Sequence, residues 1–225
     1  DVRHPLNLSR RVANFHTPAA LQEALSRDFE AQFRDLIDLD FHHSKLRPYQ
    51  REANDAIEQA IRERKRRMLV AMATGTGKTF TLVHGIYRLM KAGVARRVLF
   101  LVDRRALAAQ AARAFASFDP EPGLKFNQIY EVYTQRFQRE DFDEGDAFDP
   151  NVLPNAYLTD PKPGQAFVFI CTIQRLAINL FGREGMLEGR EGDAEEDAMQ
   201  LQIPIHAFDF VVADECHRGY TGREV

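Results

Sequence analysis

The sequence has few cysteines, no long apolar run and no strong excess of charge. Its 225 residues include only Cys171 and Cys216, which argues against a disulfide framework and favours reduced thiols. Neither cysteine stands in a spacing typical of a metal site. Since no apolar run approaches a membrane span and no signal peptide is recognisable, we expect a cytoplasmic protein with no membrane partner.

The charge balance also limits what the chain can bind. The net charge is −3, so overall charge gives no support for strong nucleic-acid binding, and any DNA contact must come from local patches. A hydrophobic content of 44% is enough for one well-buried domain.

A glycine-rich loop stands between a short apolar run and a helical segment. The run Met68–Met72 predicts a buried parallel strand. Behind it comes a loop typical of phosphate binding, because glycine tolerates positive φ and the following helix start attracts anions. Lys78 would reach the β- and γ-phosphates, and the Thr79 hydroxyl would bind Mg²⁺. The residues of the loop and helix start are Thr74, Gly75, Thr76, Gly77, Lys78 and Thr79.

Two adjacent carboxylates follow a second apolar run, Phe208–Ala213. A parallel strand at this position delivers Asp214 and Glu215 to the crevice at the carboxyl end of a sheet. Asp214 would hold Mg²⁺, and Glu215 would orient and deprotonate the attacking water. Alone, the pair is equally typical of an ordinary loop. Together with the upstream loop it predicts an ATP-hydrolysing site with ATP and Mg²⁺ as cofactors.

The residues of these motifs resemble the motifs of a known protein group. Asp214–His217 is similar to the Asp-Glu-x-His box of superfamily 2 helicases and translocases. In that group the first glycine of the phosphate-binding loop is commonly replaced by another residue, and here Met72 stands at that position. Leu46–Gln50 resembles the upstream Q motif of that group. The segments around Phe100–Arg104 and Cys171–Leu176 narrow the resemblance to the motor of the restriction (R) subunit of type I restriction-modification enzymes. It spans about residues 46–219.

This resemblance implies roles for further residues. Arg47 and Gln50 would bind adenine, with the Gln50 amide pairing to its N6 and N7 edge; the alternative for Gln50 is a surface glutamine on an amphipathic helix. His217 would couple the ATP site to the partner domain, or else be a histidine hydrogen-bonded near Asp214. The candidate contacts to DNA phosphates are Arg104, Arg105 and Thr172. Their alternative roles are a helix-start arginine pair and a helix N-cap.

The expected fold class is α/β, a RecA-like P-loop NTPase domain with a mostly parallel sheet flanked by helices. Residues 1–45 would be a helical linker from an upstream domain. Residues 46–225 would be the first RecA-like domain, with insertions near 120–165 and 182–203. Strands are predicted at 97–102 and 167–171. Helices are predicted in the stretch 19–39, from Pro48 to Ile61, and at 79–91, 104–118 and 174–181.

The resemblance also implies a function and partners. The chain would be the ATPase part of a DNA translocase and type I site-specific deoxyribonuclease. Its partners would be double-stranded DNA, a second RecA-like domain of the same polypeptide, and the modification and specificity subunits. We find no nuclease residues here. We expect weak hydrolysis by these residues alone, because the second domain supplies the arginines that complete the site.

Other functions stay open. The chain could belong to another superfamily 2 helicase, a repair factor or a type III restriction subunit. It could also be an ATP-binding switch module that moves nothing. A small-molecule P-loop kinase is disfavoured, since neither Gln50 nor the Asp-Glu-Cys-His box has a role in one.

Overall fold

A five-stranded parallel sheet organises the part of the chain that the computed structural model describes, residues 15–137, 150–183 and 197–215. Its strands run in the order β3-β2-β4-β1-β5, and every pairing is parallel. Their bounds are β1 Arg97–Val102, β2 Glu131–Thr134, β3 Asn151–Val152, β4 Phe167–Thr172 and β5 Phe210–Ala213. The expected α/β fold is confirmed. None of the described helices is long and apolar enough to cross a membrane.

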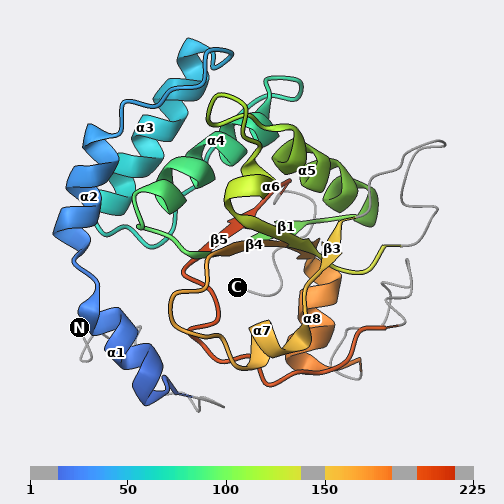
Figure 1. Cartoon of the computed structure of the whole chain (residues 1–225). Coiled ribbons are helices and arrows are strands. Elements are labelled where there is room, and N and C mark those ends of the chain that lie inside the picture. The colour runs from blue at the N-terminus through green and yellow to red at the C-terminus, as the bar shows by residue number, and fades with distance from the viewer. Residues whose placement is uncertain (1–14, 138–149, 184–196, 216–225) are drawn as a thin grey trace, which may run out of the picture.

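Helices cover both faces of the sheet, and the pleat of β1 shows how the core divides. Val98, Phe100 and Val102 pack with the layer of α4 (Lys78–Lys91) and α5 (Arg105–Ser117). Leu99 and Leu101 face the opposite layer, which includes α7 (Asn155–Thr159) and α8 (Ile173–Phe181) (Figure 1). Because both faces are buried, β1 and β4 are apolar at nearly every position, as expected of central parallel strands.

The helical stretch predicted before the sheet divides into two helices. Helix α1 (Pro18–Ser26) begins at Thr17, whose side chain accepts a hydrogen bond from the Ala20 N–H. Helix α2 (Phe29–Asp38) begins at Asp28, which accepts one from the Ala31 N–H. A residue in the cap conformation cannot continue the helix before it, so the chain breaks there. Helix α3 (Pro48–Arg62) starts at its proline, as predicted.

The segment expected as an insertion near 120–165 contributes to the sheet itself. It supplies α6 (Phe126–Ile129), β2, β3 and α7. Its aromatic residues pack on the domain, as their number predicted: the Tyr133 ring lies 5.6 Å from that of Tyr157 and 5.9 Å from that of Phe167. Phe142 and Phe148 lie outside the described residues.

The strand predicted at Met68–Met72 is wrong. These residues form no strand, and the Leu69 side chain is 82% exposed. A parallel strand needs a neighbour to satisfy its backbone groups. β5 is the nearby edge of the sheet, but among the described residues β5 pairs only with β1. The apolar run therefore remains without the partner that would bury it.

Candidate functional site: a glycine loop facing two carboxylates

The loop before α4 has the backbone that the sequence predicted. Gly75 and Gly77 both adopt φ +80°, and Gly77 is the cap residue from which α4 starts. Lys78 and Thr79 are the first two residues of that helix. The helix start thus presents its N–H groups and its positive dipole end at the loop, which is the arrangement that binds phosphate. A side chain at Gly75 would meet no atom within 4 Å, so the loop is open on that side.

Two residues of the Q-like motif hold this loop, mainly through the Thr76 carbonyl, and Arg47 supports them both. The Gln50 amide donates to the Thr76 carbonyl at 2.8 Å, and the Tyr49 hydroxyl donates to the same oxygen at 3.0 Å. The Gln50 carbonyl accepts from the Arg47 N–H at 2.9 Å, and the Arg47 guanidinium donates to the Tyr49 hydroxyl at 3.1 Å. Gln50 is 4% exposed, so it is not the free surface glutamine of the alternative interpretation. Whether it also binds adenine stays a prediction.

The contact between Gln50 and the loop explains the second glycine. A Cβ atom at Gly77 would stand 2.6 Å from the Gln50 side-chain nitrogen. Only glycine combines the positive φ with this close approach.

The two carboxylates stand at the carboxyl end of β5, as predicted. The Asp214 N–H donates to the Leu101 carbonyl at 2.8 Å and so extends the pairing with β1. The Asp214 carboxylate accepts the Glu215 N–H at 2.9 Å, and Glu215 has φ +53°. Burial raises the pKa of Asp214 above its ordinary value, partly offset by that N–H. A cation beside Asp214 would oppose this rise.

Lys78 and Glu215 bring the loop and the carboxylates together. The Lys78 ammonium lies 2.8 Å from the Glu215 carboxylate, and both side chains are about three-quarters buried, 23% and 24% exposed. The hydrogen bond that the Lys78 ammonium donates to Glu215 raises the pKa of Lys78. A carboxylate oxygen therefore lies beside the Lys78 ammonium, the group predicted to reach the phosphates. This contact brings the two distant motifs together at one site.

A cleft of about 650 Å³ opens beside the loop, between α3 and residues 65–73. Tyr49 and Thr76 line it, whereas Lys78, Asp214 and Glu215 do not. The cleft adjoins the Q-like motif and does not include Lys78 or the carboxylates, so the candidate phosphate site is defined by the loop backbone and the Lys78–Glu215 contact.

The three candidate DNA contacts differ in their surroundings. Arg104 is the cap residue of α5, and its side chain is 69% exposed. Arg105 is buried and donates to the Arg136 carbonyl at 3.0 Å. Thr172 is the N-cap of α8 and accepts the Arg175 N–H at 3.0 Å. Arg104 is thus the one of the three whose side chain reaches solvent.

Sequence reasoning missed a buried glutamine at the carboxyl ends of the strands. The Gln135 carbonyl accepts the Thr172 N–H at 2.8 Å, and Gln135 is 1% exposed. Its position directly after β2 was the available signal, since polar residues at strand ends meet at this edge. Cys171 is buried and forms no disulfide, while Cys216 and His217 lie outside the described residues.

Comparison with known proteins bears on this site. Residues 43–224 match the model of a family described as "Type III restriction enzyme, res subunit". The chain is 32% identical over 222 residues to the type I restriction enzyme EcoKI endonuclease subunit of Escherichia coli K12, and 29% identical over 183 residues to the EcoAI endonuclease subunit of Escherichia coli. These alignments cover 98% and 79% of this chain but 16% of each relative.

Two further similarities are shorter or weaker. Over 68 residues the chain is 46% identical to the putative mitochondrial ATP-dependent helicase irc3 of Schizosaccharomyces pombe, covering 30% of this chain and 11% of that one. A solved structure of a nuclease-deletion mutant of the Type ISP restriction-modification enzyme LlaGI, in complex with a DNA substrate mimic, superposes with TM-score 0.45 at 23% identity, over 77% of this chain and 15% of that one.

The chain spans about a sixth of the length of the two restriction subunits, 16% in each case. The resemblance expected from the motifs is confirmed by the family match and by these two relatives. The family match covers most of the chain, including both halves of the site. The chain therefore belongs to the family of the type III restriction enzyme res subunit, a group of superfamily 2 helicase-like domains.

Proposed function

We propose that this chain is the ATP-binding and ATP-hydrolysing motor domain of a DNA translocase, of the kind found in type I restriction subunits. The observation that carries the proposal is the meeting of Lys78, at the start of α4, with Glu215, at the end of β5. Phosphoryl transfer to water needs an anion cradle, a metal ligand and a group that handles water, and these elements supply all three.

The chain's own residues divide this work. The loop backbone from Thr74 to Gly77 would cradle the phosphates, and Gln50 with Tyr49 would keep the Thr76 peptide in place. Lys78 would leave Glu215 and bind the phosphate oxygens, because two anions compete for one ammonium group. Glu215, once released, is the carboxylate free to accept a proton from water.

The same site would also hold a magnesium ion. The Thr79 hydroxyl and the Asp214 carboxylate are oxygen ligands of the kind that Mg²⁺ prefers, and burial of Asp214 makes an uncompensated charge there costly. When bound, the ion would neutralise charge on the phosphates. Thr79 and Asp214 would hold it, and Arg47 and Gln50 would take the adenine.

The partners follow from the same proposal. Double-stranded DNA would contact Arg104, with Arg105 and Thr172 shaping the surface beside it. A second RecA-like domain of the same polypeptide would complete the site, and His217 would couple the two. Modification and specificity subunits would hold the recognition sequence. Cleavage would belong to the complete protein.

A second candidate is a helicase or type III restriction subunit, which the family description and the similarity to the irc3 helicase favour. It shares the ATP site with the first candidate and differs in what the motor does to DNA.

The test is steady-state ATP hydrolysis by the complete protein, with and without duplex DNA. We expect DNA to stimulate turnover and Lys78→Ala to abolish it, while the loss of the contact to Glu215 lowers the melting temperature by about 4 °C at most. Lys91→Ala, at the other end of α4, is the matched control and should retain turnover. Turnover without any response to DNA would make the domain a nucleotide-dependent switch. Strand-separation and translocation assays with the same protein would distinguish the two motor candidates.

A further inference from the structure

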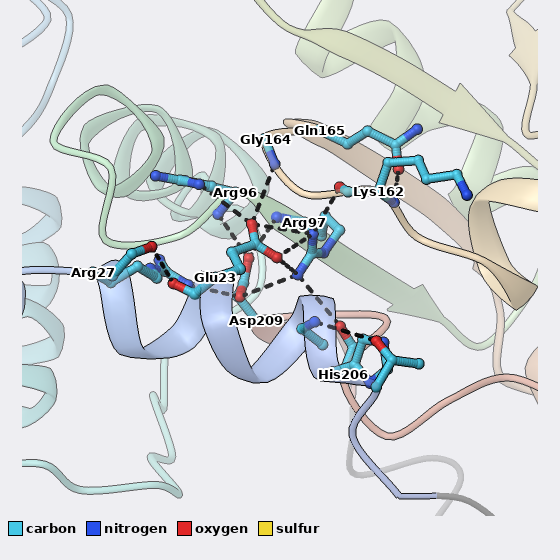
Figure 2. Close-up of polar contacts among 12 residues, drawn as sticks. Glu23, Arg27, Arg96, Arg97, Lys162, Gly164, Gln165, His206 and Asp209 are labelled. Carbon is cyan, nitrogen blue, oxygen red and sulfur yellow. Dashed lines mark hydrogen bonds and ion pairs between the residues drawn. The ribbon is translucent and has the colours of Figure 1, made fainter.

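Helix α1 lies against the amino ends of the central strands. Asp214 lies at the opposite, carboxyl ends of these strands. Figure 2 shows that its side chains reach the loops before β1, before β4 and before β5. The ring of His16, just before the helix, stacks on that of His206 with centroids 5.5 Å apart.

Glu23 is the centre of this attachment. Its carboxylate accepts hydrogen bonds from both terminal nitrogens of Arg97 at 3.2 Å, from an Arg96 side-chain nitrogen at 3.3 Å and from the Gly164 N–H at 3.3 Å. The side chains of Glu23 and Arg97 are only 8% and 4% exposed. Burial alone would raise the pKa of Glu23, but the Gly164 N–H and the Arg97 guanidinium lower it below its ordinary value, so the group is ionised at neutral pH.

Arg27 extends the attachment to the base of β5. It donates to the Asp209 carboxylate at 2.9 Å and to the Gly93 and Val94 carbonyls at 3.0 and 2.7 Å. The other Asp209 oxygen accepts the backbone N–H groups of Arg96 and Arg97, at 3.1 and 2.9 Å. Asp209 is the residue directly before β5. It therefore joins the start of this strand to α1 and to the start of β1.

Apolar contacts contribute little to holding α1. Of its hydrophobic residues only Ala20 is buried, while Leu21 is 40% exposed and Leu25 is 86% exposed. A helix of nine residues is also too short to persist alone in water. The charged contacts of Glu23 and Arg27 must therefore supply most of the attachment.

The strand at the other end of this attachment has a neighbouring strand on one side among the described residues. Among the described residues β5 pairs with β1 only, and Val211 is 56% exposed. Asp209 fixes its start, and Asp214 stands five residues later, about 17 Å along an extended strand. β5 therefore connects Asp209, at its start, directly to the two carboxylates at its end.

We propose that α1 is an electrostatic latch, through which the chain before the sheet is fastened to the base of β5 and so controls where Asp214 and Glu215 lie. Neutralising Glu23 opens the latch: α1 detaches and unfolds, and β5 loosens on β1. The latch itself does not depend on nucleotide binding, so it stands or falls separately from the proposed function.

The test is amide hydrogen exchange, followed by mass spectrometry of peptides, on the chain carrying Glu23→Gln. The amide keeps the shape of the carboxylate but sets an NH₂ group against the donors of Arg97 and Gly164. We expect exchange to accelerate about tenfold or more in residues 18–26 and in 209–213, with α5 unchanged. Glu30→Gln removes the same charge from an ion pair on α2 that is 74% exposed at the glutamate, and should change neither segment.

A second variant covers the case in which Glu23→Gln does not fold. Arg27→Gln removes the contact to Asp209 and leaves Glu23 with Arg97, so the expected acceleration has the same direction and is smaller. Unchanged exchange in residues 18–26 of a folded variant overturns the latch. Faster exchange in 18–26 with unchanged exchange in 209–213 overturns its coupling to β5.

Discussion

Removing the charge of Glu215 should strengthen ATP binding while stopping hydrolysis. In the structure the Lys78 ammonium lies 2.8 Å from the Glu215 carboxylate, and both side chains are about three-quarters buried, 23% and 24% exposed. An ion pair of this kind is worth about 1 kcal/mol, at the upper end of the range for exposed pairs. ATP must replace this contact. Glu215→Gln should therefore lower the Kd for ATP about fivefold. Because an amide cannot accept the proton of the attacking water, turnover should fall about 10²- to 10⁴-fold.

The assay combines titration calorimetry of ATP binding with single-turnover hydrolysis in the complete protein. Glu63→Gln is the matched control, since it removes the same charge from an ion pair with Lys65 at the far end of α3. The control should leave both the Kd and the turnover unchanged. Normal turnover by Glu215→Gln would mean that another group handles the water. A weaker Kd would mean that Lys78 does not bind the phosphates.

Further predictions follow from other contacts of the site and the core. Gln50→Ala should reduce the preference for ATP over GTP in competition binding, because guanine reverses the donor and acceptor at position 6; equal binding of both nucleotides by the wild type would remove the basis for the motif. Asp214→Asn should weaken ATP binding in the presence of Mg²⁺ more than ATP binding without Mg²⁺. If Mg²⁺ strengthens ATP binding by the same factor in the variant and the wild type, Asp214 is not a ligand. Burial, with the nearby Arg88, lowers the pKa of His84 to about 3, while the unfolded chain binds a proton near 6.5. The stability contributed by neutral His84 is thus present above pH 6.5 and is lost as the pH falls toward 3, by about 1.4 kcal/mol per pH unit. Urea unfolding at pH 7 and pH 5 should show that the free energy of unfolding depends less on pH in His84→Gln than in the wild type. An equal pH dependence in both proteins would show that His84 is not the group responsible.

The motifs were predictable because their chemistry is local. A glycine loop at a helix start and two acids after a strand each depend on a few adjacent residues, and Gly75, Gly77 and Asp214 lie as their patterns predicted. The strands Arg97–Val102 and Phe167–Thr172 were predictable for a related reason, since a run of apolar residues buried on both faces has few other interpretations.

Met68–Met72 shows where such reasoning fails. Its apolar character matched that of a buried strand, but burial also needs a neighbouring strand with which to pair. The sequence pattern of the run contains no information about that neighbour. Leu69 is accordingly 82% exposed, although a pattern of five apolar residues predicted burial.

The contacts between distant residues were also out of reach of the sequence. Glu23 and Arg97 are 74 positions apart, and nothing in either local pattern distinguishes a buried pair from two surface charges. The same holds for the position of Gln50, whose motif indicated adenine binding but not its hydrogen bond to the Thr76 carbonyl. Such pairs become visible only when the fold brings their elements together.

The most direct measurement of the central claim is equilibrium binding of ATP to this chain, with and without Mg²⁺, by titration calorimetry. If Lys78 on α4 and the two carboxylates after β5 form one nucleotide site, the wild type binds ATP and Mg²⁺ strengthens the binding. Lys78→Ala should then weaken it about tenfold or more, because a charge-assisted contact to phosphate is lost, while Lys91→Ala leaves it unchanged. Equal affinities of the wild type and Lys78→Ala for Mg·ATP would contradict the account.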